Sequence, residues 1–116
     1  MARHQVCRPE ELPPGAFTLV PIRKRGIGVF NVNGEYHAVN NVCPHQGGPL
    51  CEGTLTGTTA ASVPYEFAWV RDGEILSCPW HRWEIDLLTG RVLADPVKKV
   101  PKFKVWVEDG MVVLEA

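Results

Sequence analysis

Two short segments of the sequence each place a cysteine close to a histidine. Cys43 and His45 form a Cys-x-His pair, Cys78 and His81 form a Cys-x-x-His pair, and 32 residues separate the two pairs. Thiolate and imidazole are both metal ligands, and a spacing of two or three residues lets both donors of a pair reach one metal centre. The sequence therefore predicts a centre held by two Cys and two His from two separate segments.

The residues around each pair favour loops that enclose a bound group. A proline follows each cysteine, where it fixes φ and removes a backbone donor that would otherwise need a partner. Gly47 and Gly48 permit conformations that a side chain would forbid, and they let backbone N–H groups approach an anionic sulfur. We expect two such loops, around residues 43–50 and 78–83.

Composition argues against other uses of the cysteines. The chain has 116 residues, the length of one ordinary domain, and we treat residues 1–116 as one domain. Four Cys are about 3% of the chain, below the roughly 8–10% typical of disulfide-stapled secreted domains. Residues 1–9 lack the apolar stretch of a signal peptide, and no segment approaches the roughly 18 apolar residues of a membrane helix. We expect a cytoplasmic protein with reduced thiols, in which Cys7 and Cys51 are bystanders.

The balance of charge gives little reason to expect an anionic partner. Twelve Lys and Arg face thirteen Asp and Glu, a formal net charge of −1, so that neither nucleic acid nor a membrane surface is predicted as a partner. The run at residues 23–25 and the lysines Lys98, Lys99, Lys102 and Lys104 could steer an acidic partner, although solvated strand faces explain them more simply. His37 is expected at the surface or the edge of the core.

Alternating polar and apolar residues predict the elements that position the two loops. Strands are expected at residues 16–22, 27–32, 35–40, 102–108 and 111–115, with hairpin turns at Asn33-Gly34 and Asp109-Gly110. Two further hairpins are expected to turn at residues 71–73 and 89–90. Helical patterning is weak, with at most one turn at residues 9–12. The predicted fold is all-β, a small antiparallel sandwich or partly closed barrel.

Two alternative kinds of metal site can be formed by two Cys and two His. A structural zinc ion accepts this set, but zinc-finger spacings group Cys with Cys and His with His, whereas here the pairs are mixed. The mixed order instead resembles the Rieske iron–sulfur family, with Cys-x-His followed by Cys-x-x-His. Residues 43–50 and 78–86 are similar to the cluster-binding loops of that family, and residues 88–90 resemble the turn that follows its second loop.

The resemblance implies a cofactor, a fold and a role. It implies one 2Fe–2S cluster with Cys43 and Cys78 on one iron and His45 and His81 on the other, held by a two-loop subdomain of an all-β domain. It also implies a one-electron carrier between a reductase, flavin- or NAD(P)H-linked, and an oxygenase or another oxidoreductase. The chain has no room for the catalytic iron domain of Rieske oxygenases, so we expect no substrate site of its own. The alternatives are a nitrite-reductase-like small subunit and a zinc-stabilised interaction module.

Departures from the family pattern indicate which kind of Rieske protein the chain resembles. The gap between the loops is longer than usual, which predicts an insertion around residues 56–72, and Arg82 stands where the family commonly has Gly. Gly48 and Trp80 occupy the positions of the extra disulfide of respiratory-complex members. Trp83 and Ile85 replace the Ser and Tyr that donate hydrogen bonds to the cluster in those members. The chain therefore resembles a soluble Rieske-type ferredoxin of lower potential, such as the ferredoxin components of ring-hydroxylating dioxygenase systems.

Overall fold

The computed structural model describes residues 2–44, 48–63, 66–79 and 83–116, of which 58–63 and 66–70 are described by their backbone. Strands dominate, and the helical elements in these residues are two single turns of 3-10 helix. In chain order the elements are β1 (Arg3–Cys7), η1 (Pro9–Glu11), β2 (Phe17–Val20), β3 (Ile27–Val32), β4 (Glu35–Asn40), η2 (Leu50–Glu52), β5 (Thr54–Val63), β6 (Glu66–Ser77), β7 (Glu84–Asp86), β8 (Lys102–Glu108) and β9 (Met111–Glu115). No helix among them is long and apolar enough to cross a membrane.

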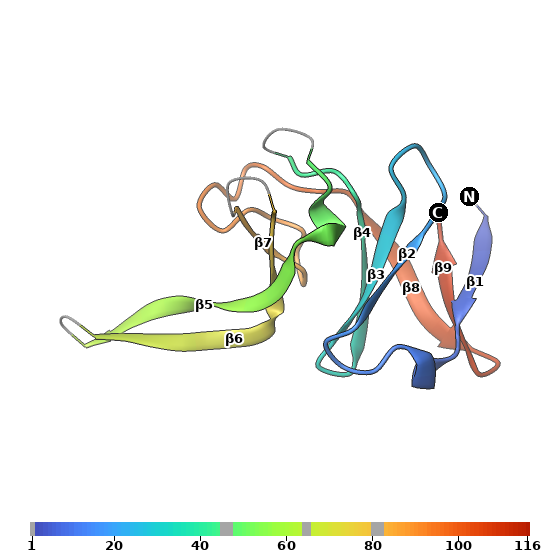
Figure 1. Cartoon of the computed structure of the whole chain (residues 1–116), viewed down its shortest axis with the longest axis horizontal. Helices are drawn as coiled ribbons and strands as arrows, with labels where there is room; N and C mark the ends of the chain where they lie inside the picture. The colour runs from blue at the N-terminus through green and yellow to red at the C-terminus, as the bar shows by residue number, and fades with distance from the viewer. Residues whose placement is uncertain (1, 45–47, 64–65, 80–82) are drawn as a thin grey trace.

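The larger sheet has six antiparallel strands in the order β1-β9-β8-β4-β3-β2 and curls into a half-barrel (Figure 1). Its two hairpin turns have positive φ at both central residues, 51° and 97° at Asn33-Gly34 and 51° and 75° at Asp109-Gly110, as type I′ turns require. Four strands match the predicted ranges. β2 is shorter than predicted, because Pro21 cannot continue the ladder.

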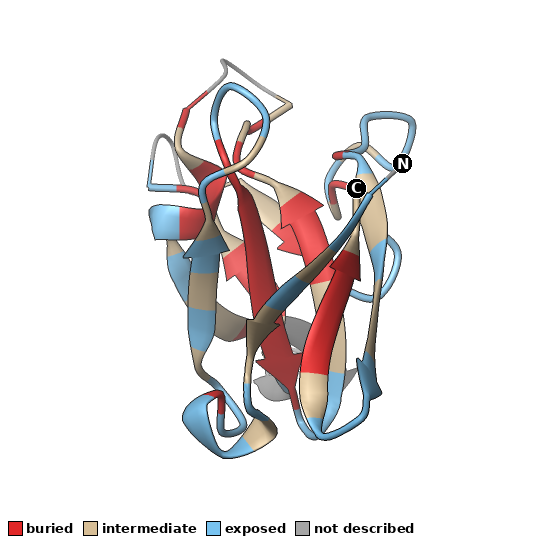
Figure 2. Cartoon of the chain, turned by 90° about the vertical axis from the view of Figure 1, so that its right-hand side faces the viewer, coloured by how far each residue is buried: buried red, intermediate tan, exposed pale blue. Residues whose placement is uncertain are grey.

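The core divides between the two faces of this sheet, since alternate residues of β3 belong to different groups of buried side chains. All six residues of β3 are buried, and buried segments gather inside the curl while exposed ones lie at its edges and loops (Figure 2). One group of buried side chains, with Ile27, Val29 and Leu114 among its members, fills the half-barrel. The other group, which we call the loop core, contains Phe30, Leu76 and both cysteines of the predicted centre.

The smaller sheet has the order β5-β6-β7 and carries the second loop. Its β5–β6 ribbon extends away from the rest of the molecule (Figure 1). The predicted hairpin at residues 71–73 is wrong, because β6 runs through these residues as one strand. Thr56 pairs with Ile75 and Thr58 with Val70, so residues 71–74 bulge opposite a single residue of β5. The link between β5 and β6 at residues 64–65 lies outside the described residues.

The predicted hairpin at residues 89–90 is present in a short form. β7 spans three residues, and the returning chain pairs with it at a single bridge between Ile85 and Val92. The Gly90 N–H closes the turn by donating to the Asp86 carbonyl at 2.6 Å, with Gly90 at a φ of 79°. The predicted all-β class, a partly closed antiparallel sheet with a subdomain that carries the two loops, is confirmed.

Candidate metal centre

The structure brings the two cysteines of the predicted centre into one buried group. Cys43 and Cys78 are 2% and 1% exposed, and both belong to the loop core. Each begins a loop that its own backbone closes: the Cys43 N–H donates to the Gly48 carbonyl at 2.8 Å, and the Cys78 N–H donates to the Trp83 carbonyl at 2.9 Å. The two loops thus present their first side chains, two cysteines that are not in disulfides, to the same apolar interior.

A close approach at Gly53 joins the end of the first loop to the start of the second. A Cβ at this position would overlap the Ser77 carbonyl oxygen and would lie 3.1 Å from Cδ of Pro79. Gly53 has an ordinary φ of −76°, so the need for glycine here is one of space and not of backbone conformation. No local sequence signal marks Gly53, because its neighbour across the contact is more than twenty positions away.

Asn41, likewise outside the predicted site, fixes the entrance of the first loop. Its side chain accepts from the Cys51 N–H at 2.8 Å and donates to the Arg25 carbonyl at 3.0 Å, and its own N–H donates to Gly26. A buried asparagine that satisfies three separate backbone groups holds a loop in one position. An Asn directly after a predicted strand and before a metal-binding loop is the signal that could have found it.

Cys51, predicted as a bystander, is a buried residue of the same loop core as Cys43 and Cys78. It lies in η2 at 0% exposure, with Sγ 3.8 Å from the Val39 carbonyl. Burial raises the pKa of its thiol to about 12, so the thiol stays protonated at neutral pH. A Cβ at Gly28 would overlap this sulfur, which shows how closely η2 packs on β3.

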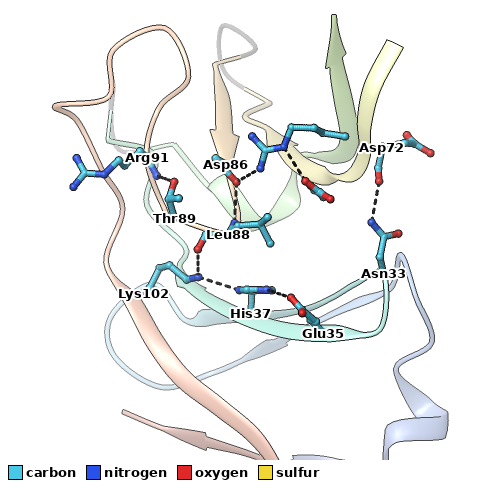
Figure 3. A network of polar contacts seen from close by, with 11 residues as sticks. Asn33, Glu35, His37, Asp72, Asp86, Leu88, Thr89, Arg91 and Lys102 are labelled. Carbon is cyan, nitrogen blue, oxygen red and sulfur yellow. Dashed lines mark hydrogen bonds and ion pairs between the residues drawn. The ribbon is translucent and has the colours of Figure 1, made fainter. Parts of the chain in front are cut away.

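A partly buried ion pair supports the strand that follows the second loop. Arg71, at the bulge of β6, donates to Asp86 of β7 at 2.7 Å and to Glu74 at 2.8 Å (Figure 3). Burial by itself would raise the pKa of Asp86, but hydrogen bonds from Arg71 and from the Leu88 N–H outweigh it and lower that pKa. The bulge therefore lies where Arg71 can bind Asp86 of β7.

A second polar contact ties the larger sheet to the turn after β7. Lys102 of β8 lies 2.9 Å from Nδ1 of His37 and donates to the Leu88 carbonyl at 2.9 Å (Figure 3). His37, predicted at the surface or the edge of the core, has a side chain that is 16% exposed at this junction. Burial and the charge of Lys102 lower the pKa of His37, and burial lowers the pKa of Lys102.

The donor set fits a soft metal centre. Thiolates select iron–sulfur clusters or zinc, and the apolar loop core around Cys43 and Cys78 keeps water away from such a group. Within the described ranges, no group of three or more Cys, His, Asp or Glu side chains is placed to hold a metal ion. His45 and His81, the other two predicted ligands, lie outside the described residues.

Comparisons with known proteins agree with this description. The family model of the Rieske [2Fe-2S] domain matches residues 2–104. A 3-phenylpropionate/cinnamic acid dioxygenase ferredoxin subunit from Photorhabdus laumondii is 30% identical over 98% of this chain and 94% of its own. A ferredoxin component of naphthalene 1,2-dioxygenase/salicylate 5-hydroxylase systems from a Ralstonia species is 25% identical over 91% of this chain and 88% of its own.

Solved structures share the fold. The ferredoxin of Sphingomonas yanoikuyae B1 superposes with a TM-score of 0.71 over 99% of both chains, at 24% identity. A putative small subunit of an NADPH nitrite reductase superposes with a TM-score of 0.69 over the full length of both chains, at 18% identity. At these identities the two structures support the architecture alone.

Proposed function

This chain belongs to the Rieske [2Fe-2S] domain family, and we propose that it is the ferredoxin component of a dioxygenase system. As a member of that family it is an electron carrier with one Rieske 2Fe–2S cluster. The observation that carries the assignment is the pair of buried thiols at the bases of two adjoining loops. The relatives that are ferredoxin components of dioxygenase systems support the finer role, because they match this chain over most of their own length.

We assign the cluster to the four residues that the spacing predicts, Cys43, His45, Cys78 and His81. When bound, the cluster supplies a site that accepts and releases a single electron. Two thiolates and two neutral imidazoles leave the oxidised centre neutral, whereas four thiolates would leave it doubly negative, so this ligand set makes the centre easier to reduce. The apolar side chains of the loop core exclude water around the cysteines.

The proposed role includes partners and a location. A reductase, flavin- or NAD(P)H-linked, would supply the electron, and an oxygenase would receive it, so that the chain needs no substrate site of its own. We place the protein in the cytoplasm, where cysteines outside disulfides stay reduced. The nitrite-reductase alternative is supported by fold alone, at 18% identity. The dioxygenase ferredoxins, with identities up to 30%, favour the first assignment over it and over a zinc module.

Spectroscopy of the purified protein tests the assignment. We expect a red-brown protein with two irons and two sulfides per chain and an EPR signal that appears on reduction. His81→Ala and Cys78→Ser should remove the Rieske spectrum, while His4→Ala, outside the two loops, should leave it unchanged. A colourless protein with one zinc per chain would contradict the proposal, as would a normal spectrum from the His81 variant.

A further inference from the structure

Positive charge is concentrated in one segment of this nearly neutral chain. Residues 91–104 contain five of the twelve Lys and Arg but only one of the thirteen Asp and Glu. Arg91, Lys98, Lys99 and Lys104 of this segment are exposed. Among the residues that the structure describes, none of these four forms an ion pair with a carboxylate. No neighbouring carboxylate among the described residues therefore neutralises their charge.

A hollow lies within this basic surface. It has a volume of about 440 Å³ and is lined by Thr89, Lys99, Val100, Pro101 and Lys102. Arg91 points away from the polar contacts around Asp86 and Lys102 (Figure 3). Two exposed apolar residues adjoin the surface in the sequence, Leu88 at 37% and Val97 at 85% exposure. A basic surface with a hollow and scattered apolar residues suits a protein partner that carries carboxylates.

Lys98 connects this surface with the candidate metal centre. Its Nζ lies 5.2 Å from the centre of the Trp83 ring, a cation–π contact. The Trp83 side chain packs on the loop core, which contains Cys43 and Cys78, and its carbonyl accepts from the Cys78 N–H. A partner bound over Lys98 would thus lie against the closing residue of the second loop.

We propose that this surface, centred on Lys98, Lys99 and the hollow beside them, docks the electron donor of the chain, a redox protein with a carboxylate-rich surface. The inference rests on the proposed function, because it needs an electron carrier. In the step, the donor loses one electron and the cluster gains it, without a bond being made or broken. The added negative charge weakens the attraction for carboxylates, which favours release of the donor after transfer and suits the donor better than the acceptor.

Stopped-flow reduction tests the docking surface. The probe is reduced flavodoxin, an acidic one-electron flavoprotein donor, mixed with the oxidised holoprotein at low and at high ionic strength. The test variant is Lys98→Glu/Lys99→Glu. The matched control is Arg3→Glu/Arg8→Glu, which makes the same change in net charge near β1, on the far side of the molecule from β7 (Figure 1). Lys98→Arg/Lys99→Arg keeps the charge.

We expect the lysine-to-glutamate variant to be reduced about tenfold more slowly at low ionic strength, with the difference lost at high salt. The control and the arginine variant should stay within about twofold of wild type. With reduced methyl viologen, a small cationic donor of low potential, the glutamate variant should not be slower than wild type. Equal slowing in the two glutamate variants, or no slowing in either, would overturn the docking inference. A protein that no donor reduces would instead contradict the proposed function.

Discussion

At the scale of single residues, the contact between His37 and Lys102 depends on protonation. Nδ1 of His37 accepts from Lys102 only while that nitrogen carries no proton. Burial and the nearby Lys102 charge lower the pKa of His37 from its usual 6.5, although Glu35 acts in the opposite direction. Between the lowered pKa and 6.5 the unfolded chain binds more protons at this residue than the folded chain. The contribution of His37 to the free energy of unfolding is therefore fully present above about pH 6.5. It is lost as the pH falls through the lowered pKa.

The lowered pKa of His37 predicts a pH-dependent loss of stability that one substitution removes. Urea unfolding between pH 5 and 8 should show wild type losing stability below about pH 6.5 more steeply than His37→Gln. His4→Gln, in β1, is the control and should keep the wild-type profile. Parallel profiles for wild type and His37→Gln would show that the imidazole contributes nothing to this pH dependence.

At the scale of elements, the two loops meet because η2 ends directly against the end of β6. Gly53 follows η2, and its backbone touches the Ser77 carbonyl, one residue before Cys78. Asn41 holds the other side of the first loop through Cys51 and Arg25. The distance between the loops is thus set by backbone packing, which side-chain rotation cannot adjust.

Gly53→Ala should therefore disrupt the approach of the two loops. The added methyl overlaps a backbone oxygen, so relief requires the loop ends to separate, and we expect a loss of more than about 3 kcal/mol in unfolding free energy. The adjacent exposed residue provides the control, since Thr54→Ala should change stability by less than about 1 kcal/mol. Denaturant titration of both variants measures the difference, and similar stabilities would refute the steric argument.

The β5–β6 ribbon carries a separate prediction. β7 pairs with β6 only at Ile75, Leu76 and Ser77, and Arg71 anchors the bulge to Asp86, so the ribbon beyond the bulge pairs with itself. We expect replacement of residues 59–69 by an Asn-Gly turn to leave the fold intact, with a change in unfolding free energy below about 1 kcal/mol. The same replacement combined with Arg71→Ala should lower the unfolding free energy by more than the replacement alone. Loss of folding in the shortened chain would contradict the expectation that residues 56–72 contain an insertion.

At the scale of the whole molecule, the surroundings of the cluster set its potential. Ile85, which the resemblance aligns with a hydrogen-bonding residue of high-potential members, is fully buried in the loop core and has no side-chain donor. Fewer hydrogen bonds to the cluster leave the added electron less stabilised, so that the potential is lower.

We therefore predict a potential near the lower end of the roughly −150 to +300 mV range of Rieske centres, below about 0 mV. A redox titration followed by visible circular dichroism measures it. Ile85→Tyr, which restores a hydroxyl donor at that position, should raise the potential if the variant folds, whereas Ile85→Phe is the size-matched control without the donor. A wild-type value well above about +100 mV would contradict the prediction.

Much of the fold follows from short-range sequence signals. Asn33-Gly34 and Asp109-Gly110 adopt positive φ with little strain, so their hairpins are encoded by adjacent residues, and β3, β4, β8 and β9 match the predicted ranges. The turn signal at residues 71–73, by contrast, predicts a hairpin that the structure does not have. These residues instead form a bulge, because β5 pairs with β6 on both sides of them.

The sequence by itself determined the donor types, their spacing, the family and the all-β class, because each depends on residues a few positions apart or on patterns repeated along the strands. Only the tertiary structure decided that Cys43 and Cys78 share one buried core, that Gly53 must lack a side chain, and that Cys51 is sealed inside. It also placed Lys98 on Trp83. Each of these facts depends on a contact between segments distant in the sequence, which a local pattern does not encode.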